Sequence, residues 1–219
     1  MDKNQDMYDY FNKRGISKAT VDAFEIFEEK GWYGFQYFNT EGELENIKYR
    51  NKQKNFRQSQ GAKQILYNYK NIAKENTVVF VEGEMDVLSV AETGYKATSL
   101  ANGAGKVAKF NPKDSRFKAL ENCPLLARKI IIFTDNDVAG KALHKELLHR
   151  FGKDICWFVR VPENCKDAND VLVKLGKDKL KQILDEAEPY PIDGLYRAND
   201  YYTQVQDLYD GNYEKPIEI

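Results

Sequence analysis

Carboxylate side chains follow three short apolar segments of this 219-residue chain, at the points where those segments end. In chain order, the residues are Glu82 and Glu84, then Asp135 and Asp137, and last Asp167 and Asp170. Carboxylates that are brought together raise each other's pKa values unless a cation lies between them. Mg²⁺ is the natural cation, because it is small and prefers oxygen ligands. Two such ions stabilise the attacking and leaving oxygens of a phosphoryl displacement, so these residues predict metal-assisted phosphoryl transfer.

Each of these acids also has a purely structural interpretation. A single Asp or Glu at the start of a helix caps the helix or interacts with its dipole. Asp86 occupies such a first-turn position, which is favourable without any metal. Acidic groups after three separate strands are harder to explain as caps, and this coincidence favours a metal site. Gly103 and Gly140 lie in the neighbouring loops and fit a tight turn or a close approach of the backbone.

The segments that position these acids alternate between short strands and helices from Thr77 onward. The predicted strands are residues 77–81, 97–100, 129–134 and 155–161, and the predicted helices are 85–93, 138–151 and 169–187. This pattern is typical of a parallel sheet covered by helices on both faces. Right-handed crossovers place the carboxyl ends of the strands at one edge, where α/β proteins carry their sites. We therefore expect the acidic groups to meet at that edge.

The first part of the chain predicts a smaller α+β unit. Helical spacing and capping residues predict helices at residues 8–13 and 18–29. An aromatic, alternating segment then predicts a β-hairpin with strands 32–38 and 44–50 around a turn at 39–42. Its aromatic residues Trp32, Tyr37 and Tyr49 have two interpretations, since they can stack on the bases of a single strand or pack the hairpin.

A basic run begins in the second strand of this hairpin. No acidic residue occurs from Asn46 to Lys74, whereas eight lysines and arginines do. In a strand, Lys48 and Arg50 share one face, and Lys52 and Lys54 extend that face if the strand continues. By itself a basic run is usually a solvated surface, and polyanion binding needs independent support.

Composition limits the class of protein. Hydrophobic residues make up 42% of the chain, charged residues 31%, and the net charge is −1, all typical of a globular protein. The three cysteines form no C-x-x-C pair, and only His144 and His149 remain as zinc ligands, so a zinc ribbon is excluded within this chain. The odd cysteine count and the absence of a secretory signal predict reduced thiols in a cytosolic protein. No apolar run approaches the roughly 20 residues of a membrane-spanning helix.

Three sequence motifs carry a family resemblance. Residues 81–86 and 135–140 resemble the Toprim family, whose pattern is a glutamate after one strand and Asp-x-Asp after a later one. The two segments are most similar to bacterial and phage primases, and residues 166–170 resemble the third acidic motif of phage primase-helicases. Residues 10–17 and 47–57 resemble the basic subdomain that precedes Toprim in those proteins and in Twinkle-type helicases.

The resemblance implies an architecture. It implies an α/β fold with a Toprim-type parallel sheet and flanking helices, preceded by a smaller α+β basic subdomain. The expected parts are the N-terminal subdomain at residues 1–75, the catalytic domain at 76–188 and a linker or docking segment at 189–219. The last segment resembles the linker that leads into a hexameric helicase, although no Walker motif follows it and no zinc ribbon precedes the first.

The resemblance also implies roles for individual residues. Glu82, Asp135 and Asp137 are the implied catalytic and metal-binding residues, and Asp167 is an additional metal ligand or acts through an ordered water. The implied nucleotide-binding or template-binding residues are Lys48 and Lys54, supported by Arg50 and Arg57. The residues expected to support the site are Asp86, Gly103, Gly140 and Asp170.

The implied activity is that of a primase in DNA replication. Such an enzyme makes short RNA primers from ribonucleoside triphosphates on a single-stranded DNA template, with two Mg²⁺ or Mn²⁺ ions and no zinc in this part. The implied partners are a replicative helicase and a zinc-ribbon module, in the cytoplasm of a bacterial or phage-infected cell and without a membrane.

Two alternatives remain open. Toprim carboxylates also serve phosphodiester hydrolases, in which water replaces the attacking hydroxyl. The basic run and the motif at residues 166–170 favour synthesis over hydrolysis. A non-catalytic platform that binds single-stranded DNA beside a helicase is expected when a primase part has lost its acids, whereas this chain retains Glu82, Asp135, Asp137 and Asp167.

Overall fold

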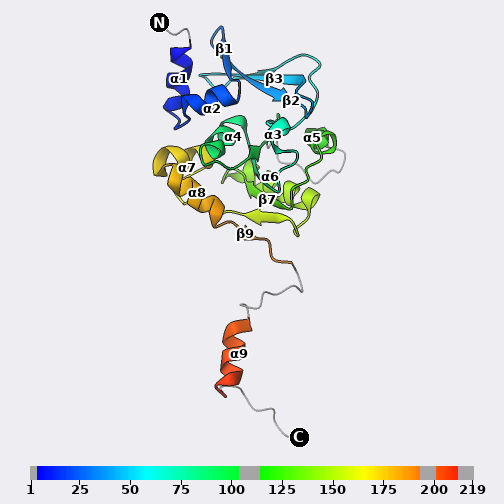
Figure 1. Cartoon of the computed structure of the whole chain (residues 1–219), viewed down its shortest axis with the longest axis vertical. Coiled ribbons are helices and arrows are strands. Elements are labelled where there is room, and N and C mark those ends of the chain that lie inside the picture. The colour runs from blue at the N-terminus through cyan, green and yellow to red at the C-terminus, as the bar shows by residue number, and fades with distance from the viewer. Residues whose placement is uncertain (1–3, 104–113, 193–200, 212–219) are drawn as a thin grey trace.

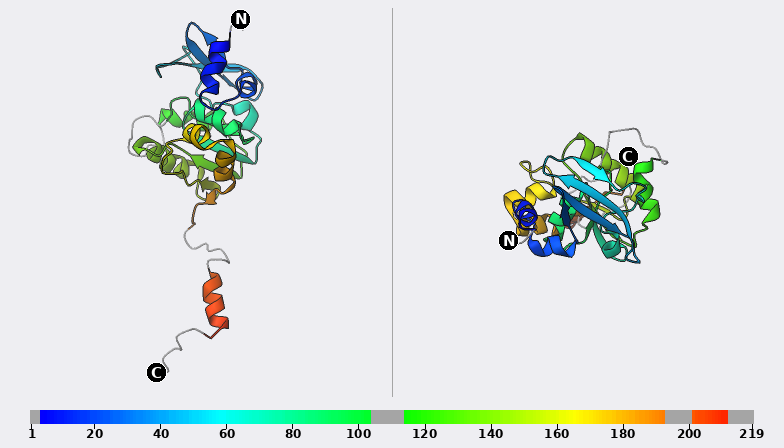
Figure 2. Two further views of the ribbon diagram at one scale, coloured as in Figure 1. Left: turned by 90° about the vertical axis from the view of Figure 1, so that its left-hand side faces the viewer. Right: turned by 90° about the horizontal axis from the view of Figure 1, so that it is seen from above.

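The computed structural model describes residues 4–103, 114–192 and 201–211. These residues form two sheets, one antiparallel with strand order β1-β2-β3-β4 and one with order β6-β5-β7-β8-β9. The antiparallel sheet and the first two helices form a layer that lies on top of the second, larger α/β layer (Figures 1 and 2). The predicted order, a small α+β unit followed by a larger and mostly parallel α/β unit, is confirmed.

The first layer consists of short helices and four strands within residues 4–72, all of which the structure describes. They are α1 (Gln5–Asn12), α2 (Lys18–Ala23), β1 (Phe27–Glu29), β2 (Trp32–Phe38), β3 (Leu44–Asn51) and β4 (Phe56–Gln58), and the short helix α3 (Tyr69–Ile72) follows them and contacts both sheets. Side chains alternate across β2, so Tyr33, Phe35 and Tyr37 all point to one face and are buried. The ring of Phe11 in α1 packs edge-on against Tyr33 and Phe35, at 5.5 and 6.3 Å between ring centroids. This aromatic core fixes the helix against the sheet.

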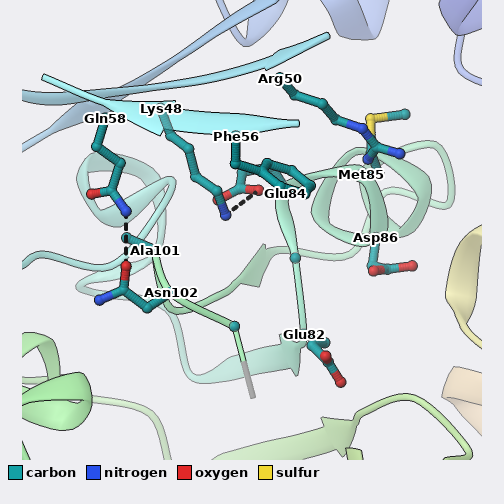
Figure 3. A pocket seen from close by; sticks show the side chains of 12 residues that line it. Lys48, Arg50, Phe56, Gln58, Glu82, Glu84, Met85, Asp86, Ala101 and Asn102 are labelled. Carbon is teal, nitrogen blue, oxygen red and sulfur yellow. Dashed lines mark hydrogen bonds and ion pairs between the residues drawn. The ribbon is translucent and has the colours of Figure 1, made fainter. Parts of the chain in front are cut away.

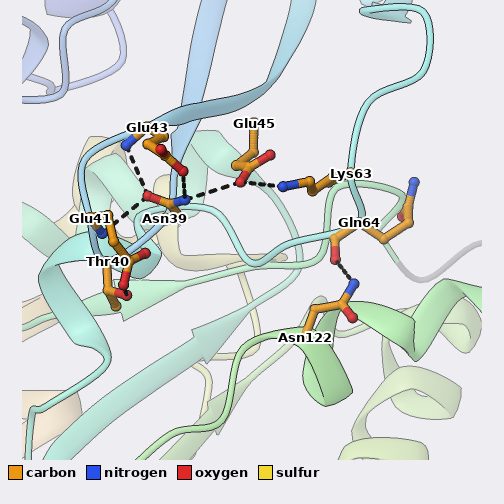
Figure 4. Close-up of polar contacts among 8 residues, drawn as sticks. All are labelled: Asn39, Thr40, Glu41, Glu43, Glu45, Lys63, Gln64 and Asn122. Carbon is orange, nitrogen blue, oxygen red and sulfur yellow. Dashed lines mark hydrogen bonds and ion pairs between the residues drawn. The ribbon is translucent and has the colours of Figure 1, made fainter.

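One asparagine side chain builds the turn between β2 and β3 (Figure 4). Asn39 accepts hydrogen bonds from the backbone N–H groups of Glu41 and Glu43, at 3.1 and 2.9 Å. Its amide group also donates to the carboxylate of Glu45, which in turn pairs with Lys63 at 2.6 Å. Because the turn fixes the register of a hairpin, these bonds help to decide which β3 residues face the second layer.

The second layer is built on a mostly parallel sheet. Its strands are β5 (Thr77–Val81), β6 (Ala97–Thr98), β7 (Lys129–Phe133), β8 (Cys156–Phe158) and β9 (Glu188–Pro189). Four successive residues of β5, Val78 to Val81, are fully buried. Successive strand residues point to opposite faces, so both faces of the sheet are covered, as expected. The exception to parallel pairing is β9, which lies antiparallel to β8 at the edge of the sheet.

Helices and one short 3₁₀ turn connect and cover these strands. Within the described residues they are α4 (Glu84–Ala91), η1 (Ser115–Phe117), α5 (Lys118–Asn122), α6 (Val138–Phe151), α7 (Ala168–Leu175) and α8 (Lys177–Asp185). In the register of β5 and β7, Val81 lies opposite Phe133, so the two central strands end at the same level. Residues that follow these two strands are therefore neighbours.

The predicted helix at residues 18–29 is wrong in its second half. The helix ends at Ala23, and the residues that follow it form β1 instead. Phe27 pairs with Gly34 of β2, and its ring occupies the space above that glycine, where an added Cβ would lie 2.3 Å from the ring. This packing across strands overrides the helical spacing of the sequence.

The predicted extension of the basic strand face is also wrong. Strand β3 ends at Asn51, whose side chain accepts from the backbone N–H groups of Gln53 and Asn55. Lys54 has a φ of 64° within this turn, and the chain returns as β4. Lys52 and Lys54 therefore belong to a turn and do not continue the face that carries Lys48.

The predicted tail at residues 189–219 is described only in part. It begins with Pro189, the last residue of β9, and contains one further helix, α9 (Tyr202–Tyr209), whereas residues 193–200 and 212–219 lie outside the described residues. The proposed domain boundaries after residues 75 and 188 stay predictions. Among the described helices, none has both the length and the apolar character required to cross a membrane.

Candidate active site

The end of the parallel sheet brings three carboxylates together. Glu82 directly follows β5 and Asp135 follows β7 by two residues, at the edge where these neighbouring strands end together. Asp137 begins α6 from the same loop. The three acids therefore lie at one edge of the sheet, as expected from the sequence, while their convergence on a shared metal ion and their catalytic roles remain predictions.

Glu82 lies in a partly buried place among other acids. Burial, followed by repulsion from Asp135 and Asp137, raises the pKa of its carboxyl from an ordinary value of 4.5 to about 7. Its Oε2 atom is buried and has no hydrogen-bond partner among the described residues. A buried carboxylate oxygen without a partner is costly, so this atom is available to a ligand that carries positive charge.

Asp135 and Asp137 differ in environment although they are two residues apart. Asp135 is 12% exposed, and burial raises its pKa, while an ion pair with Lys166 at 2.8 Å acts in the opposite direction. Asp137 caps α6 by accepting the Gly140 N–H at 2.9 Å, and this hydrogen bond lowers the pKa of the Asp137 carboxyl. Asp137 therefore has the structural role of a helix cap in addition to any role in metal binding.

Lys166 supplies the positive charge within this acidic group. Its ammonium lies 2.8 Å from Asp135 and 3.4 Å from Asp137, and these carboxylates raise its pKa. The side chain is 54% exposed, so it can leave without breaking the core. No role was predicted for this residue from the sequence. The available signal was its position directly before Asp167 in the third acidic motif.

The third acidic group organises the loop that carries Lys166. Asp167 caps α7 by accepting the Asp170 N–H at 2.7 Å. Asp170 accepts the backbone N–H of Lys166 at 3.1 Å and the ammonium of Lys174 at 3.0 Å, and the lysine lowers its pKa. Helix capping by Asp167 and the pairing of Asp170 with Lys174 therefore explain the contacts that these acids make in the structure. A metal-binding role for Asp167 stays a prediction.

Asp86 is linked to the start of α7 by a hydrogen bond with Asn169. Asp86 is buried, and its Oδ1 accepts the Asn169 N–H at 3.1 Å. Burial and repulsion from nearby aspartates raise its pKa well above the ordinary value. The Asn169 amide also donates to the carbonyl of Arg14 and to the hydroxyl of Ser89, both at 2.9 Å. Asn169, whose role was not predicted from the sequence, thus ties α7 to α4 and to the first layer.

Gly140 is required by a close approach of backbones. A Cβ atom at this position would lie 2.0 Å from the carbonyl oxygen of Asp135, which is far inside van der Waals contact. Gly103 has a φ of 57° and lies beside Glu82, 3.7 Å from its carbonyl oxygen as measured from an ideal Cβ. The predicted supporting roles of both glycines have a physical basis, a close approach for the first and a left-handed conformation for the second.

A cavity of about 390 Å³ opens between the two layers beside Glu82 (Figure 3). Basic and aromatic side chains of β3 and β4 line its upper side, and the acids Glu82 and Asp86 lie on the side of the second layer. The residues around it are Lys48, Arg50, Phe56, Gln58, Glu82, Gly83, Glu84, Met85, Asp86, Ala101, Asn102 and Gly103. A cavity with cations on one side and carboxylates on the other suits a ligand that carries phosphate and metal.

The four predicted basic residues occupy different places. Lys48 and Arg50 face the cavity, whereas Lys54 is exposed in the turn before β4. Arg57 points to the opposite face of the sheet, with its guanidinium 4.5 Å from the ring centroids of both Trp32 and Tyr49. Only the first two therefore lie beside Glu82.

The three candidate stacking residues are engaged within the protein. Tyr37 is fully buried, so the packing interpretation holds for it. Trp32 and Tyr49 flank Arg57 on the outer face of the sheet, where cation–π contact holds the three side chains together.

The carboxylates at the sheet edge are chemically suited to a hard divalent cation, but they are not arranged as a complete set of metal ligands. Among the residues that the structure describes, no group of three or more His, Cys, Asp or Glu side chains is arranged to hold an ion. The donors at the sheet edge are all oxygens, one Glu82 oxygen is unpartnered within the described chain, and Lys166 provides the cation between the two aspartates. Movement of the exposed Lys166 side chain would free both aspartates.

Comparison with known proteins identifies the class. Residues 79–172 match the family model described as Toprim-like. The primase fragment of the bacteriophage T7 primase-helicase protein has a similar structure, with a TM-score of 0.66 and 26% identity over 78% of this chain and 70% of that chain. Residues 79–172 are therefore similar to a Toprim domain, within a fold similar to that of a primase fragment.

Two curated relatives come from Arabidopsis thaliana. The Twinkle homolog protein, chloroplastic/mitochondrial, is 35% identical over 223 residues, which cover 94% of this chain and 31% of that protein. The primase homolog protein is 35% identical over 205 residues, which cover 85% of this chain and 60% of that protein. This chain thus spans about a third and about three fifths of the two relatives.

Replacing Gly140 by alanine tests the close approach of α6 to Asp135. We expect Gly140→Ala to lower the free energy of unfolding by about 1–3 kcal/mol, since the added methyl group has no room. Urea unfolding followed by circular dichroism measures the change. Lys141→Ala, at the exposed neighbouring position of the same helix, is the control. Equal stability of the two variants would contradict the close approach.

The raised pKa of Glu82 predicts a pH-dependent stability. Between pH 4.5 and about 7 the folded protein holds a proton that the unfolded chain has released, so Glu82 lowers stability as pH rises through this window. Glu82→Gln removes this titration. We expect its advantage in free energy of unfolding over the unmodified protein to grow across the window and then level off, as measured by urea unfolding without divalent ions. Glu121→Gln on the surface of α5 should show no such growth.

Removing the Lys166 charge tests its competition with a metal. We expect Lys166→Met to tighten Mn²⁺ binding on the order of 10-fold, because a positive charge beside two carboxylates disfavours a second cation. Electron paramagnetic resonance of free Mn²⁺ measures the affinity. Lys174→Met is the matched control, since Lys174 pairs with Asp170 in the adjoining helix α7. Unchanged or weaker binding in Lys166→Met would show that Lys166 does not compete.

Proposed function

We propose that the chain is the catalytic core of a DNA primase, which joins ribonucleotides on a single-stranded DNA template. The single observation that carries this proposal is that Glu82, Asp135 and Asp137 lie at one end of the sheet, with Glu82 lining a cavity that has a basic upper side. The similarity to the T7 primase fragment and to the two Arabidopsis proteins supports it.

In this proposal Glu82, Asp135 and Asp137 hold divalent cations, Mg²⁺ or Mn²⁺, and Asp167 assists from the start of α7. Bound there, such ions supply positive charge to the attacking 3′-hydroxyl and to the leaving pyrophosphate.

In this proposal, the basic residues bind different parts of the nucleotide and the template. Arg50 faces the cavity, and its planar guanidinium matches the oxygens of a triphosphate. Lys54 in the exposed turn and Arg57 on the outer face would contact the template backbone, where each positive charge contributes sequence-independent affinity. The protein's contribution to the reaction is then positioning and charge neutralisation.

The proposed partners follow from the same relatives. A helicase is proposed because the structural relative is part of a primase-helicase and the curated relative is a Twinkle homolog. A separate zinc-ribbon module is proposed as the reader of the template, because the cysteines and histidines of this chain lack zinc-ribbon spacing. The segment at residues 189–219 is the proposed connection toward the helicase.

A primer-synthesis assay tests the function. The full chain is incubated with single-stranded DNA, ribonucleoside triphosphates and Mg²⁺ or Mn²⁺, with and without an added zinc-ribbon module. We expect RNA products that Glu82→Gln reduces by roughly 100-fold or more, because a catalytic carboxylate is lost. Glu121→Gln is the matched control, with the same substitution on an exposed helix.

Two results would replace the proposal. Degraded DNA in place of RNA products, with the same dependence on Glu82, identifies a phosphodiester hydrolase. Binding of single-stranded DNA that Glu82→Gln leaves unchanged, with no metal-dependent activity in either protein, identifies a non-catalytic platform.

A further inference from the structure

A buried ion pair connects the two layers next to the candidate active site. The Lys48 ammonium lies 2.8 and 3.0 Å from the two carboxylate oxygens of Glu84. Their side chains are only 11% and 6% exposed. Lys48 comes from β3 of the first layer and Glu84 from the first turn of α4 in the second, so the pair bridges the layers at the cavity (Figure 3).

Two aromatic residues enclose this pair. The hydroxyl of Tyr37 donates a hydrogen bond to the same Glu84 carboxylate, and complete burial next to that charge raises the pKa of Tyr37, so it remains a donor. The Phe56 ring lies on the cavity side, with its centroid 5.2 Å from the Lys48 ammonium. Glu84 thus receives hydrogen bonds from β2 and β3 together, in a place shielded from water.

Because of this ion pair, Lys48 and Arg50 differ in how they can bind a ligand. The Lys48 charge is already neutralised by a carboxylate, and pulling the two apart in a buried place leaves two uncompensated charges. Arg50 lies two residues further on the same strand face and lines the cavity. Its Nε atom is buried and has no hydrogen-bond partner in the described part of the chain. Two of the three Lys48 donors are directed at Glu84, whereas the Arg50 Nε has no partner within the described residues, so Arg50 is the better placed of these two cations to donate to a ligand.

Both members of the ion pair lie close in the sequence to residues of the candidate active site. Glu84 lies two residues after Glu82, and Lys48 lies two residues before Arg50. We propose that Lys48, Glu84 and Tyr37 form a positioning unit that fixes β3, and with it Arg50, at a set distance above Glu82. Lys48 acts on the reaction through Glu84 and makes no contact with the nucleotide. This inference rests on the proposed primase function and assigns the nucleotide phosphates to Arg50.

A double-variant experiment separates positioning from direct contact. The variants are Lys48→Met, Glu84→Gln and the two combined. Each single variant leaves a buried charge without its partner, whereas the combined variant leaves two neutral side chains of similar size, one of which still accepts from Tyr37. Lys63→Met with Glu45→Gln is the control, because that pair joins an exposed lysine to the same strand at 2.6 Å.

The first measurement is hydrogen exchange of the β3 amides, which needs no activity. We expect exchange roughly 10-fold faster in each single variant and within about threefold of the unmodified protein in the combined variant. The control should match the unmodified protein. Failure of the combined variant to restore slow exchange overturns the proposed link between β3 and α4.

The second measurement is primer synthesis as a function of nucleotide concentration. We expect kcat to fall about 10-fold or more in the single variants with KM within about threefold, and kcat to recover largely in the combined variant. Arg50→Met should instead raise KM. A combined variant with raised KM and activity as low as Lys48→Met shows direct contact of Lys48 with the nucleotide and overturns the proposal. Altered exchange with unchanged kcat overturns the positioning role.

The two proposals can fail separately. If the unmodified chain makes no primers under any condition, the primase function fails, while hydrogen exchange still tests the link between the layers. If primers are made and depend on Glu82 but the combined variant does not recover, the positioning unit fails alone.

Discussion

The structure depends on holding like charges together at the end of a parallel sheet. Glu82 and Asp135 follow neighbouring strands that end at the same level, so the backbone holds these two residues close together. Burial first, and repulsion from Asp135 and Asp137 second, raise the pKa of Glu82. The fully buried strands β5 and β7 supply the hydrophobic free energy that tolerates this local cost. A site of this kind is destabilising by itself and exists because the core around it is stable.

Local patterns in the sequence predict much of this sheet and of its acidic edge. Buried strands such as β5 and β7 are continuous apolar runs, and α6 has the predicted bounds at Val138 and Phe151. The first layer was harder to predict because its pairing is not local. Phe27 joins β1 because a glycine on β2 leaves room for its ring, and no spacing within residues 18–29 contains that information.

The same distinction applies to the site. Parallel topology alone brings Glu82 and Asp135 together, so the acidic group could be predicted. The residues that hold or neutralise it could not, because their partners are distant in the chain. Asn169 reaches Arg14 across 155 positions, and Lys48 reaches Glu84 across 36. The basic run was recognised as a whole, but the sequence does not reveal that Lys48 is neutralised and that Arg57 points away from the cavity.

Burial gives the two lysines of the site opposite properties. The side chains of Lys48 and Glu84 are only 11% and 6% exposed, and separating them would leave two poorly solvated charges, so their pairing is a stable part of the fold. Lys166 is 54% exposed beside Asp135, and exposed pairs of this kind contribute little to stability and exchange readily. Lys48 can therefore fix the distance between the layers. Lys166 can move away from Asp135 and Asp137 when a cation binds to them. The chemistry proposed for this edge requires both properties in neighbouring positions.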